Sequence, residues 1–279
     1  MNAKELVNEI EQRLEDLAAR TQAAKTSKEV LDYLQFMGRF HRYSFHNTLS
    51  IWLHCPHATQ VAGYATWKKL GRFVKKGERG IPILAPCPVR RVAADEEDQE
   101  REEQFVYFKV VYVFDVSQTD GKPLPEAPIT TTGDGRGLRP VVERLARELG
   151  IDFAYKPLHG SHHGTSFGGR VEIDERLDEA GKVSVMIHEL AHELLHRGPD
   201  RNEISRDQRE TEAEAVSFIV CSHFGIETEA PNYLALWDAT AETITQAFQR
   251  VQKTAAEMID RMEDIVASMA PPRRESMVS

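Results

Sequence analysis

The sequence contains a short pattern whose residue types and spacing are suited to metal chemistry. His188, Glu189 and His192 form an HExxH pattern inside the largely apolar segment 183–196. On a helix, histidines four residues apart lie one above the other, so both imidazoles can reach one metal ion, with Glu189 close by. Imidazole is a preferred ligand of Zn²⁺, which acidifies the water that it holds. The pattern therefore predicts a catalytic zinc ion, or another divalent cation, with Glu189 as the general base.

An acidic segment further along the chain is expected to supply the third metal ligand. Gly198 stands where a metzincin has its third histidine, so that type of site is excluded. Glu210 and Glu214 share one face of a predicted helix, whereas Glu212 points away from that face. We expect Glu210 to bind the metal and Glu214 to orient one of the two histidines without touching the metal. The reverse, with Glu214 as the ligand and Glu210 as the orienting residue, stays open.

Several further groups are candidates for a place in this site. His196 follows His192 by one turn and is expected to support it or to lie at the surface, rather than to bind the metal. His223 and Tyr233 are candidates for stabilising an oxyanion, and the sequence selects neither. The short alternating stretch 170–174 predicts a strand, which is either a plain edge strand or an edge on which an extended peptide can pair.

The patterning of apolar residues predicts the elements that hold these groups. Steps of three and four residues predict helices at 3–24, 27–36, 40–54, 140–149, 183–196, 210–224 and 240–267, and the first three are expected to pack together. Hairpins are expected within 61–86, and residues 105–116 form the strongest strand signal. The acidic stretch 95–103 predicts a solvated loop, and the proline- and glycine-rich stretch 117–140 predicts a domain linker.

A basic segment with interleaved aromatic residues lies in the N-terminal half. Residues 61–91 hold eight basic side chains and a single acidic one, Glu78. Positively charged grooves with aromatic faces hold single-stranded nucleic acid without reading its sequence, although the same pattern fits a hairpin whose aromatic residues are buried. The candidate nucleic-acid-binding residues are Tyr64, Trp67, Lys68, Lys69, Arg72, Lys75, Lys76 and Arg79.

Length and composition limit the classes of protein that remain. The chain has 279 residues, of which 41% are hydrophobic and 28% charged, and this fits two globular domains rather than a disordered chain. Its net charge of -9 argues against a surface that is coated uniformly by nucleic acid. No apolar run is long enough for a membrane span, and the N-terminus lacks the features of a secretory signal. We therefore expect a cytoplasmic protein with no membrane partner.

Two parts of the chain resemble known families. The segments 43–53 (YSFHNTLSIWL) and 61–86 (VAGYATWKKLGRFVKKGERGIPILAP) resemble the N-terminal domain of ArdC-type antirestriction proteins, over residues 5–120. This resemblance implies that the basic segment binds single-stranded DNA. The later half is similar to the ImmA/IrrE-like and ArdC-type zinc peptidases through the HExxH pattern and the acidic segment that begins at Glu210. In those families the first glutamate of that segment binds the metal, whereas Glu214 stands where many gluzincin-like segments have aspartate.

Together these patterns predict an α+β protein with two domains. We expect an N-terminal domain of helices and an antiparallel sheet at residues 1–122, a linker at 123–139, a zincin-like domain of the gluzincin type at 140–270 and a disordered tail at 271–279. The expected function is that of a DNA-associated zinc metallopeptidase of the antirestriction type, which binds single-stranded DNA and cleaves a protein or peptide. Two alternatives remain: a non-enzymatic protein that protects single-stranded DNA and has a structural metal, and a regulatory protease that cleaves a repressor.

Overall fold

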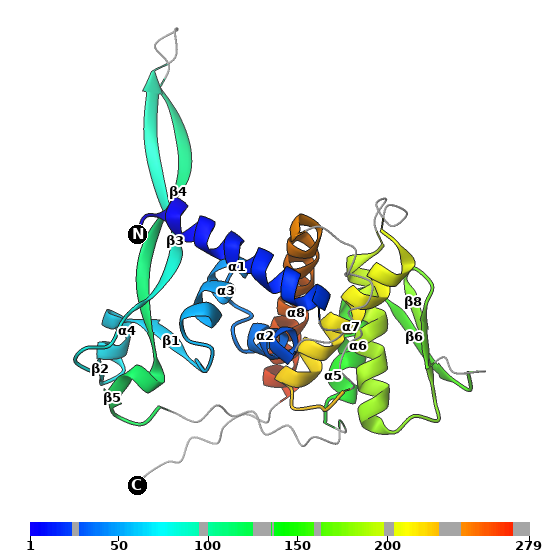
Figure 1. Cartoon of the computed structure of the whole chain (residues 1–279). Helices are drawn as coiled ribbons and strands as arrows, with labels where there is room; N and C mark the ends of the chain where they lie inside the picture. The colour runs from blue at the N-terminus through cyan, green and yellow to red at the C-terminus, as the bar shows by residue number, and fades with distance from the viewer. Residues whose placement is uncertain are drawn as a thin grey trace. The chain divides into compact units, whose positions relative to one another are not determined.

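Helices and short sheets alternate along the chain in an α+β arrangement (Figure 1). The computed structural model describes residues 1–23, 28–94, 100–124, 135, 137–158, 163–197, 204–228 and 241–269. The chain divides into two compact units, of which the first comprises Met1–Ala19 and Tyr43–Ala127 and the second Arg20–Arg42 and Pro128–Ser279. Residues 125–134 of the predicted linker and the predicted tail 271–279 lie outside the described residues, as does Tyr233.

One helix from the N-terminal part of the chain belongs to the second unit. Helix α2 (Lys28–Arg39) packs against α7 (Arg206–His223) and α8 (Ala241–Met269). The compact units thus differ in their bounds from the domain predicted at residues 1–122, and the expected packing of the first three helices on one another stays a prediction. The apolar face of an amphipathic helix shows that the helix is buried, but it does not show which partner buries it.

The first unit combines helices with two small antiparallel sheets. Its elements are the first part of α1 (Ala3–Ala23), α3 (Phe45–His54), β1 (Val61–Gly63), α4 (Tyr64–Lys69), β2 (Arg72–Val74), β3 (Ile81–Ala94), β4 (Glu100–Asp115), the 3-10 helix η1 (Val116–Gln118) and β5 (Thr119–Gly121). β4 pairs with β1 on one side and with β3 on the other, and Val113 of β4 faces both Gly63 and Ile81. β2 and β5 form the second pair.

Strand pairing in this unit extends beyond the predicted strands. The long strand predicted at 105–116 is confirmed as β4, but it begins at Glu100, so residues 100–103 of the predicted acidic loop pair with β3. Helix α4 interrupts the segment 61–86, for which the sequence predicts hairpins only. β5 lies in a stretch predicted to be a linker and pairs with β2. Phe73 of β2 faces Asp120 of β5, and local propensity does not reveal a pairing between segments so far apart in the sequence.

The outer edge of β3 offers few backbone groups to another strand. At alternate positions along β3 the backbone groups face this outer edge, and three of these positions are prolines, which have no N–H to donate: Pro82, Pro86 and Pro88. Between them, the amide of Leu84 donates to Oδ1 of Asn47 in α3 at 2.8 Å, and Nδ2 of Asn47 donates to the Leu84 carbonyl at 2.9 Å. Prolines and helix α3 thus close this edge between residues 82 and 88.

The second unit places a small sheet beside a group of helices (Figure 1). Its elements are α2, α5 (Arg139–Glu148), β6 (Asp152–Lys156), β7 (Gly164–Ser166), β8 (Arg170–Asp174), α6 (Glu179–Leu195), α7 and α8. The helices predicted at 140–149, 183–196, 210–224 and 240–267 are confirmed as α5, α6, α7 and α8. Both α6 and α7 begin a turn earlier than predicted, because the side chains of Asp178 and Ser205 cap their N-termini.

The order of the sheet corrects the prediction about its edge. The strand predicted at 170–174 is confirmed as β8, but it pairs in parallel with β6 and antiparallel with β7. As the central strand, β8 offers no free edge to a peptide. β7 is an edge strand and contacts α6. The sequence does not predict β7, since a three-residue strand containing Gly164 carries little β propensity.

The helix that carries the HExxH pattern lies in the core of the second unit. Val183, Met186, Ile187 and Leu190 of α6 are fully buried, and the helix contacts α5, α7, α8, β7 and β8. Its polar side chains are therefore held by packing on several sides. Although α6 is apolar over much of its length, neither it nor another helix among the described residues is both long and apolar enough to cross a membrane.

Candidate metal centre

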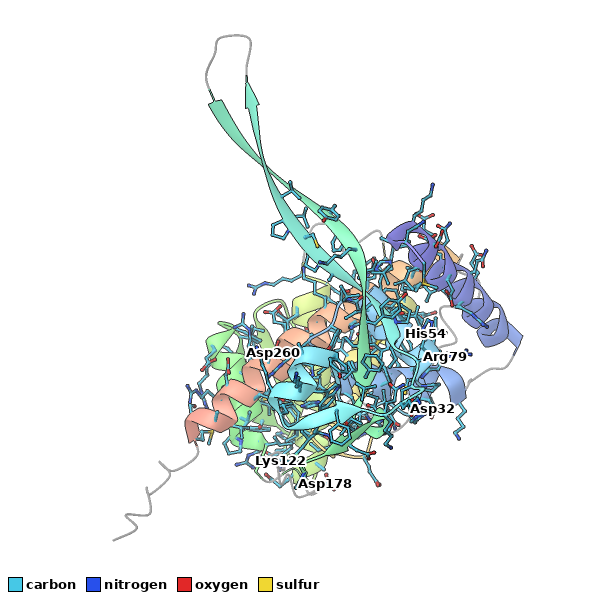
Figure 2. All side chains as sticks on the ribbon, turned by 90° about the vertical axis from the view of Figure 1, so that its left-hand side faces the viewer. Asp32, His54, Arg79, Lys122, Asp178 and Asp260 are labelled. Carbon is cyan, nitrogen blue, oxygen red and sulfur yellow. The ribbon has the colours of Figure 1, made fainter. Side chains whose placement is uncertain are left out.

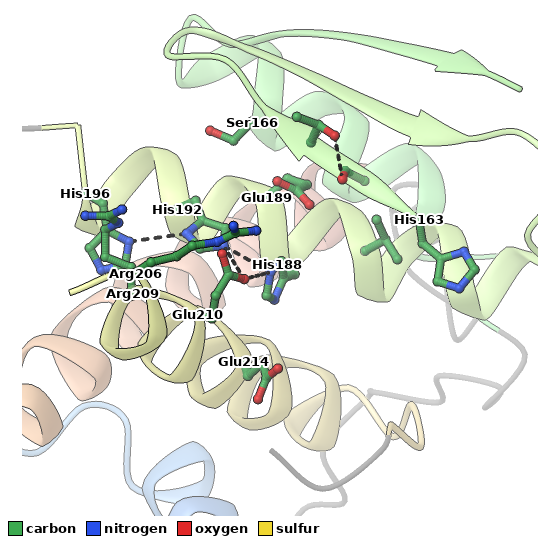
Figure 3. A pocket seen from close by; sticks show the side chains of 13 residues that line it. His163, Ser166, His188, Glu189, His192, His196, Arg206, Arg209, Glu210 and Glu214 are labelled. Carbon is green, nitrogen blue, oxygen red and sulfur yellow. Dashed lines mark hydrogen bonds and ion pairs between the residues drawn. The ribbon is translucent and has the colours of Figure 1, made fainter. Parts of the chain in front are cut away.

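Two helices bring three potential metal ligands to one point (Figure 3). α6 presents His188 and His192, and α7 presents Glu210. The Nε2 atoms of the two histidines lie 3.1 Å apart. Oε2 of Glu210 lies 3.3 Å from Nε2 of His192 and 3.6 Å from Nε2 of His188. The structure thus brings together the three residues that the sequence predicts to bind a metal.

The distances between these atoms fit a divalent cation. Two ligands at about 2.0–2.1 Å from a tetrahedral ion lie about 3.3–3.4 Å apart, close to the three separations. The side chains of His188, His192 and Glu210 are 23%, 15% and 45% exposed, and they line an open pocket of about 850 Å³. Two imidazole nitrogens and a carboxylate oxygen suit Zn²⁺ or a similar divalent metal, and they leave the pocket side open.

Glu189 lies beside the three ligands and is almost fully buried. It is 6% exposed and is directed toward the pocket between α6 and β7 (Figure 3). The pKa of its carboxyl is raised to about 7, mainly by burial; His188 opposes the increase, and the negative charges of Glu210 and Glu193 add to it. A carboxyl group with a pKa near 7 can both accept and release a proton at neutral pH.

Strand β7 passes so close to Glu189 that it requires glycine. A Cβ atom at Gly164 would lie 2.5 Å from Cγ1 of Val185 and 2.6 Å from Oε1 of Glu189. Thr165 and Ser166 of the same strand also line the pocket. The edge strand therefore borders the space into which the metal ligands and Glu189 face.

A second buried carboxylate fixes the turn that follows β7. Glu193 is 4% exposed and accepts hydrogen bonds from the hydroxyl of Ser166 at 2.5 Å and from the amides of Gly168 and Gly169 at 2.7 and 2.6 Å. Glu193 follows His192 directly on α6. The helix that presents the histidines thus also holds the β7–β8 turn in position.

Behind His192, a row of buried polar groups sets the orientation of its ring. Nδ1 of His192 lies 3.3 Å from Nδ1 of His196, and Nε2 of His196 lies 3.1 Å from Oε2 of Glu212. His196 and Glu212 are 3% and 1% exposed. From this network we infer that His196 donates to the carboxylate through Nε2 and accepts at Nδ1 from His192, which leaves Nε2 of His192 available to bind a metal ion.

The charge of Glu212 is matched by its partners. Arg250 of α8 hydrogen-bonds its carboxylate, and Gln208 donates to Oε1 at 3.2 Å. Burial by itself raises the pKa of Glu212, but the hydrogen bonds from His196 and Arg250 outweigh burial, and the pKa is lowered overall. Burial lowers the pKa of His196, which favours the neutral ring. A charged glutamate and a neutral histidine agree with the inferred donor pattern.

The acidic residues of α7 take different places around the centre. Glu212 points away from the ligand atoms, as the sequence predicts, and it is buried against His196. Glu214 lines the pocket one turn beyond Glu210 (Figure 3), and its expected role in orienting a histidine stays a prediction. The signal for Glu212 is its position within a helix whose neighbouring residues are buried. A glutamate on such a face needs a hydrogen-bonding partner, and Glu212 has one in His196 and another in Arg250.

One oxyanion candidate lies away from the pocket. Nδ1 of His223 lies 3.0 Å from the Gly38 carbonyl, and the ring is not among the residues that line the pocket. The option of an oxyanion-stabilising His223 is therefore wrong. Arg206 and Arg209, which the sequence analysis does not single out, line the pocket instead. For Arg206, the sequence feature that could have indicated this position is its spacing, because Arg206 precedes Glu210 by one helical turn.

Two of the predicted nucleic-acid contacts serve the fold of the first unit. Trp67 is 2% exposed, and its Nε1 donates to the Phe114 carbonyl at 2.9 Å. The expectation that Trp67 contacts nucleic acid is wrong, because the ring lies on the buried face of α4. Arg72 donates to Oγ1 of Thr119 at 2.8 Å and to the Lys122 carbonyl at 2.5 Å, so its guanidinium is engaged within the unit.

Other aromatic residues of the first unit are strongly exposed. Tyr64 and Phe73 are each 58% exposed. On β4, Tyr107 is 55% exposed and Phe108 is 54% exposed. Figure 2 shows the ribbon of β3 and β4 extending away from the rest of this unit. The exposed basic residues of the segment are Lys68, Lys69, Lys75, Lys76 and Arg79. A strand that is apolar at successive positions predicts burial on both faces, so the exposure of these rings on β4 is not evident from the sequence.

Two family models match separate parts of the chain. Residues 1–114 match the N-terminal domain of the anti-restriction factor ArdC. Residues 146–257 match the IrrE N-terminal-like domain of peptidase family M78. The second match includes the three potential metal ligands and Glu189.

Curated relatives are similar over most of this chain. An uncharacterized protein of Bacillus anthracis, pXO2-81, is 26% identical over 303 residues, which cover 92% of this chain and 51% of the relative. The uncharacterized protein y4eC of Sinorhizobium fredii is 26% identical over 239 residues, which cover 77% of this chain and 76% of that protein. The chain thus spans about half the length of the Bacillus anthracis relative.

Crystal structures of ArdC from plasmid R388 have a similar fold. The metal-free structure matches with a TM-score of 0.55 and 18% identity, over 82% of this chain and 87% of that protein. The Mn(II)-bound structure matches with a TM-score of 0.51 and 19% identity, over 85% and 99%. Both domain families thus occur here in one chain, and the fold is similar to that of ArdC from plasmid R388.

Proposed function

We propose that this chain is a DNA-associated peptidase of the antirestriction type that depends on a divalent metal. The observation that carries the proposal is the placement of His188, His192 and Glu210, whose ligand atoms lie 3.1 to 3.6 Å apart beside a pocket. Zinc suits this set of donors. The Mn(II) bound to ArdC of plasmid R388 supports a divalent ion in this class of fold.

The proposed reaction is hydrolysis of a peptide bond. When bound, the cation supplies Lewis acidity, which polarises a carbonyl group and makes water more acidic. Glu189 takes a proton from water onto its buried carboxylate and later delivers it to the leaving amine, and its pKa of about 7 suits both steps. His196 keeps Nε2 of His192 available as a ligand. Arg206, at the pocket, offers positive charge to the carbonyl oxygen.

An extended peptide is the substrate that this pocket favours. β7 is an edge strand of its sheet among the described residues, and it borders the pocket. Proteins commonly bind extended peptides by adding them to such an edge through backbone hydrogen bonds. A segment paired with β7 passes beside Glu189, because Gly164 lies directly against that carboxyl.

Replacement of the buried carboxyl group tests the proposed reaction. Glu189→Gln should bind zinc as the wild type does, yet hydrolyse unfolded casein at least about 100-fold more slowly, because an amide cannot shuttle the proton. Glu175→Gln, which alters an exposed residue just before α6, is the matched control and should keep the wild-type rate. Wild-type hydrolysis by Glu189→Gln would remove Glu189 from the mechanism.

Binding of single-stranded DNA is the activity proposed for the first unit. Tyr64 and Phe73 are more than half exposed and stand in the same segment as Lys68, Lys76 and Arg79, which are also exposed. Aromatic faces in positive surroundings hold single strands by stacking on bases and by phosphate contacts. The exposed rings of β4 extend the surface available for stacking.

Fluorescence anisotropy with a labelled oligothymidine tests this activity. Tyr64→Ala and Phe73→Ala should each weaken binding by about 5- to 100-fold at fixed salt, the range for loss of one stacked base. Lys76→Gln should weaken binding and reduce the salt dependence by about one phosphate contact. Phe167→Ala, which removes a ring 60% exposed in the second unit, is the control. Binding that does not respond to salt would contradict the proposal.

Two other functions make different predictions for the same measurements. A non-enzymatic protein that protects DNA would use the metal only to stabilise its fold, so His188→Ala/His192→Ala should unfold the second unit. Under the proposed function, this double variant stays folded, binds DNA and loses hydrolysis. A regulatory protease that recognises a repressor through the first unit would hydrolyse protein but show no salt-dependent binding of single-stranded DNA.

A further inference from the structure

A second group of histidine and carboxylate side chains lies in the second unit. His41, just after α2, and Asp260 and Glu263 of α8 have ligand atoms that all lie within 4.8 Å of one another. His223, at the end of α7, adds its Nε2 at 3.1 Å from Oε1 of Glu263. Figure 2 labels Asp260 on α8. We propose that this cluster of four residues, the α2–α8 cluster, is a second binding site for a divalent transition-metal cation.

The α2–α8 cluster is separate from the HExxH centre. Glu210 and His223 belong to the same helix but are thirteen residues apart, which corresponds to about 20 Å along the axis. None of the four residues of the cluster lines the pocket of the centre. Metal bound in the cluster would therefore be additional to metal bound by His188 and His192.

Both histidines of the cluster present the same ring nitrogen to the carboxylates. Nδ1 of His41 lies 2.9 Å from the Gly38 carbonyl, and Nδ1 of His223 lies 3.0 Å from the same oxygen. A carbonyl oxygen only accepts, so both Nδ1 atoms carry hydrogen, and the neutral rings keep a lone pair on Nε2. Histidines that bind metals commonly donate their other ring nitrogen to a backbone carbonyl in this way. The two rings are thus prepared as ligands.

The two histidine pairs of the second unit have similar ring geometry. The centroids of His41 and His223 lie 5.1 Å apart with an interplanar angle of 83°. For His188 and His192 the corresponding values are 4.7 Å and 82°. The ring geometry of the two pairs is therefore similar. In the cluster, His41 belongs to the group of ligand atoms that lie within 4.8 Å of one another, and His223 adjoins this group through Glu263.

One nitrogen of the cluster is buried without a hydrogen-bond partner. Nε2 of His41 has none among the described residues, although its side chain is only 8% exposed. It faces Oδ1 of Asp260 at 3.3 Å. A lone pair directed at a carboxylate is unfavourable, and a buried polar atom without a partner costs free energy. A cation between Nε2 and the carboxylates satisfies both groups.

A close helix contact makes the shared carbonyl available. A Cβ atom at Gly38 would lie 3.2 Å from the Ile219 carbonyl oxygen and 3.6 Å from Cβ of His223. Glycine therefore allows α2 to approach α7 closely enough for one carbonyl to receive both histidines. The arrangement depends on packing within the unit and not on an exposed loop.

Arg42 is the cation that contacts these carboxylates in the structure. One of its terminal nitrogens lies 2.8 Å from Oε2 of Glu263, and its Nε lies 3.4 Å from Oδ1 of Asp260. Its side chain is 70% exposed, so it can leave without disturbing the core. One guanidinium balances one of the two carboxylates, whereas a divalent cation balances both. Two imidazole nitrogens and carboxylate oxygens are donors that Zn²⁺ accepts.

Zinc binding to the full-length chain, measured by isothermal titration and by metal analysis after dialysis, tests this proposal. The wild type should bind two equivalents, and His188→Ala/His192→Ala should keep one. Addition of Glu263→Gln to that double variant should remove the remaining equivalent. Glu257→Gln, which changes an exposed residue on α8 that pairs with Arg261, is the matched control and should leave two.

Removal of the competing guanidinium gives a second, opposite effect. Arg42→Met keeps all four proposed ligands and should tighten zinc binding at the cluster by about fivefold, the scale of an exposed ion pair. The proposal is overturned if the wild type binds a single equivalent that disappears in His188→Ala/His192→Ala, or if Arg42→Met leaves the second affinity unchanged. If the double variant fails to fold by circular dichroism, the stoichiometries of the wild type and of the single variant Glu263→Gln decide.

Discussion

The two units of the molecule depart from ordinary burial in opposite directions. In the second unit, Glu189, Glu193 and Glu212 are charged residue types that are at most 6% exposed. In the first unit, Tyr64 and Phe73 are aromatic residues that are 58% exposed. Folded proteins mostly bury apolar side chains and expose charged ones, so each departure needs a physical reason.

The two departures serve different purposes. Buried carboxylates need hydrogen-bond donors, and Glu193 and Glu212 have them in Ser166 and Arg250. Polar groups fixed in this way suit chemistry, because they do not reorganise when a reaction occurs. Exposed rings give up burial in the free protein and regain it when a partner covers them. Under the proposed function, the second unit would therefore act through fixed interior groups and the first unit through its surface.

The largest loss of stability is expected from a buried aromatic residue of the first unit. Trp67→Ala removes a ring that is 2% exposed and should lower the free energy of unfolding by about 3–5 kcal/mol. Tyr64→Ala, on the same short helix, should change it by less than about 0.5 kcal/mol. Urea unfolding followed by circular dichroism measures both. Equal losses from the two substitutions would break the distinction between buried and surface rings.

A somewhat smaller loss is expected from the interior of the second unit. Arg250→Met leaves Glu212 without its cation and should lower the free energy of unfolding by about 3 kcal/mol, near the lower limit for a broken buried pair because Arg250 is 36% exposed. Arg261→Met, on the same helix, breaks an exposed pair with Glu257 and should cost less than about 1 kcal/mol. Thermal and urea unfolding of both variants compare the two. Similar values would show that the charge on Glu212 is not held in the way described.

Metal affinity probes the support behind His192. His196→Ala removes the acceptor for Nδ1 of His192 and should weaken zinc binding at the HExxH centre by about 10- to 100-fold, as is usual for residues that orient a ligand. His196→Gln retains an acceptor and should recover part of the loss. Competition with a chromophoric chelator measures the affinities. An unchanged affinity in His196→Ala would separate the buried row from metal binding.

The smallest effect concerns a buried carboxylate of the first unit that has only neutral donors. Burial tends to raise the pKa of Asp115, but hydrogen bonds from Ser117, Thr59 and Gln60 lower it overall. With a pKa below its unfolded value of about 3.9, Asp115 stabilises the fold above that pH, and the stabilisation is lost as the pH falls through the folded value. Unfolding of the wild type between pH 3 and 6 should show this loss, and Asp115→Asn should flatten it. A parallel dependence in both proteins would exclude Asp115 as its source.

What the sequence predicts depends on how far apart the interacting residues are. The HExxH histidines could be placed on one face because helical spacing alone fixes their relation. Glu210 needed one further step, the packing of two consecutive helices. Arg250, which is 38 residues from Glu212, has no local signal for its partner. The same holds for His223, which meets the Gly38 carbonyl across 185 residues.

Local sequence patterns also do not predict which aromatic side chains are buried or which strand lies at the edge of the sheet. Tyr64 and Trp67 stand three residues apart in one basic segment, yet only one of them meets the Phe114 carbonyl. Composition shows that the segment is basic and aromatic, but it does not show which side of a short helix faces the sheet. For the same reason the sequence predicts that β8 is a strand, but its central position in the sheet depends on β7, which the sequence does not predict.

The position of Glu193 beside His192 has a mechanical consequence. Glu193 of helix α6 accepts hydrogen bonds from the backbone between β7 and β8, and the same helix carries His188, His192 and Glu189. The same helix therefore fixes the turn after β7 relative to the two imidazoles and Glu189. Under the proposed function, a peptide paired with β7 would stay aligned with these groups without a closing lid.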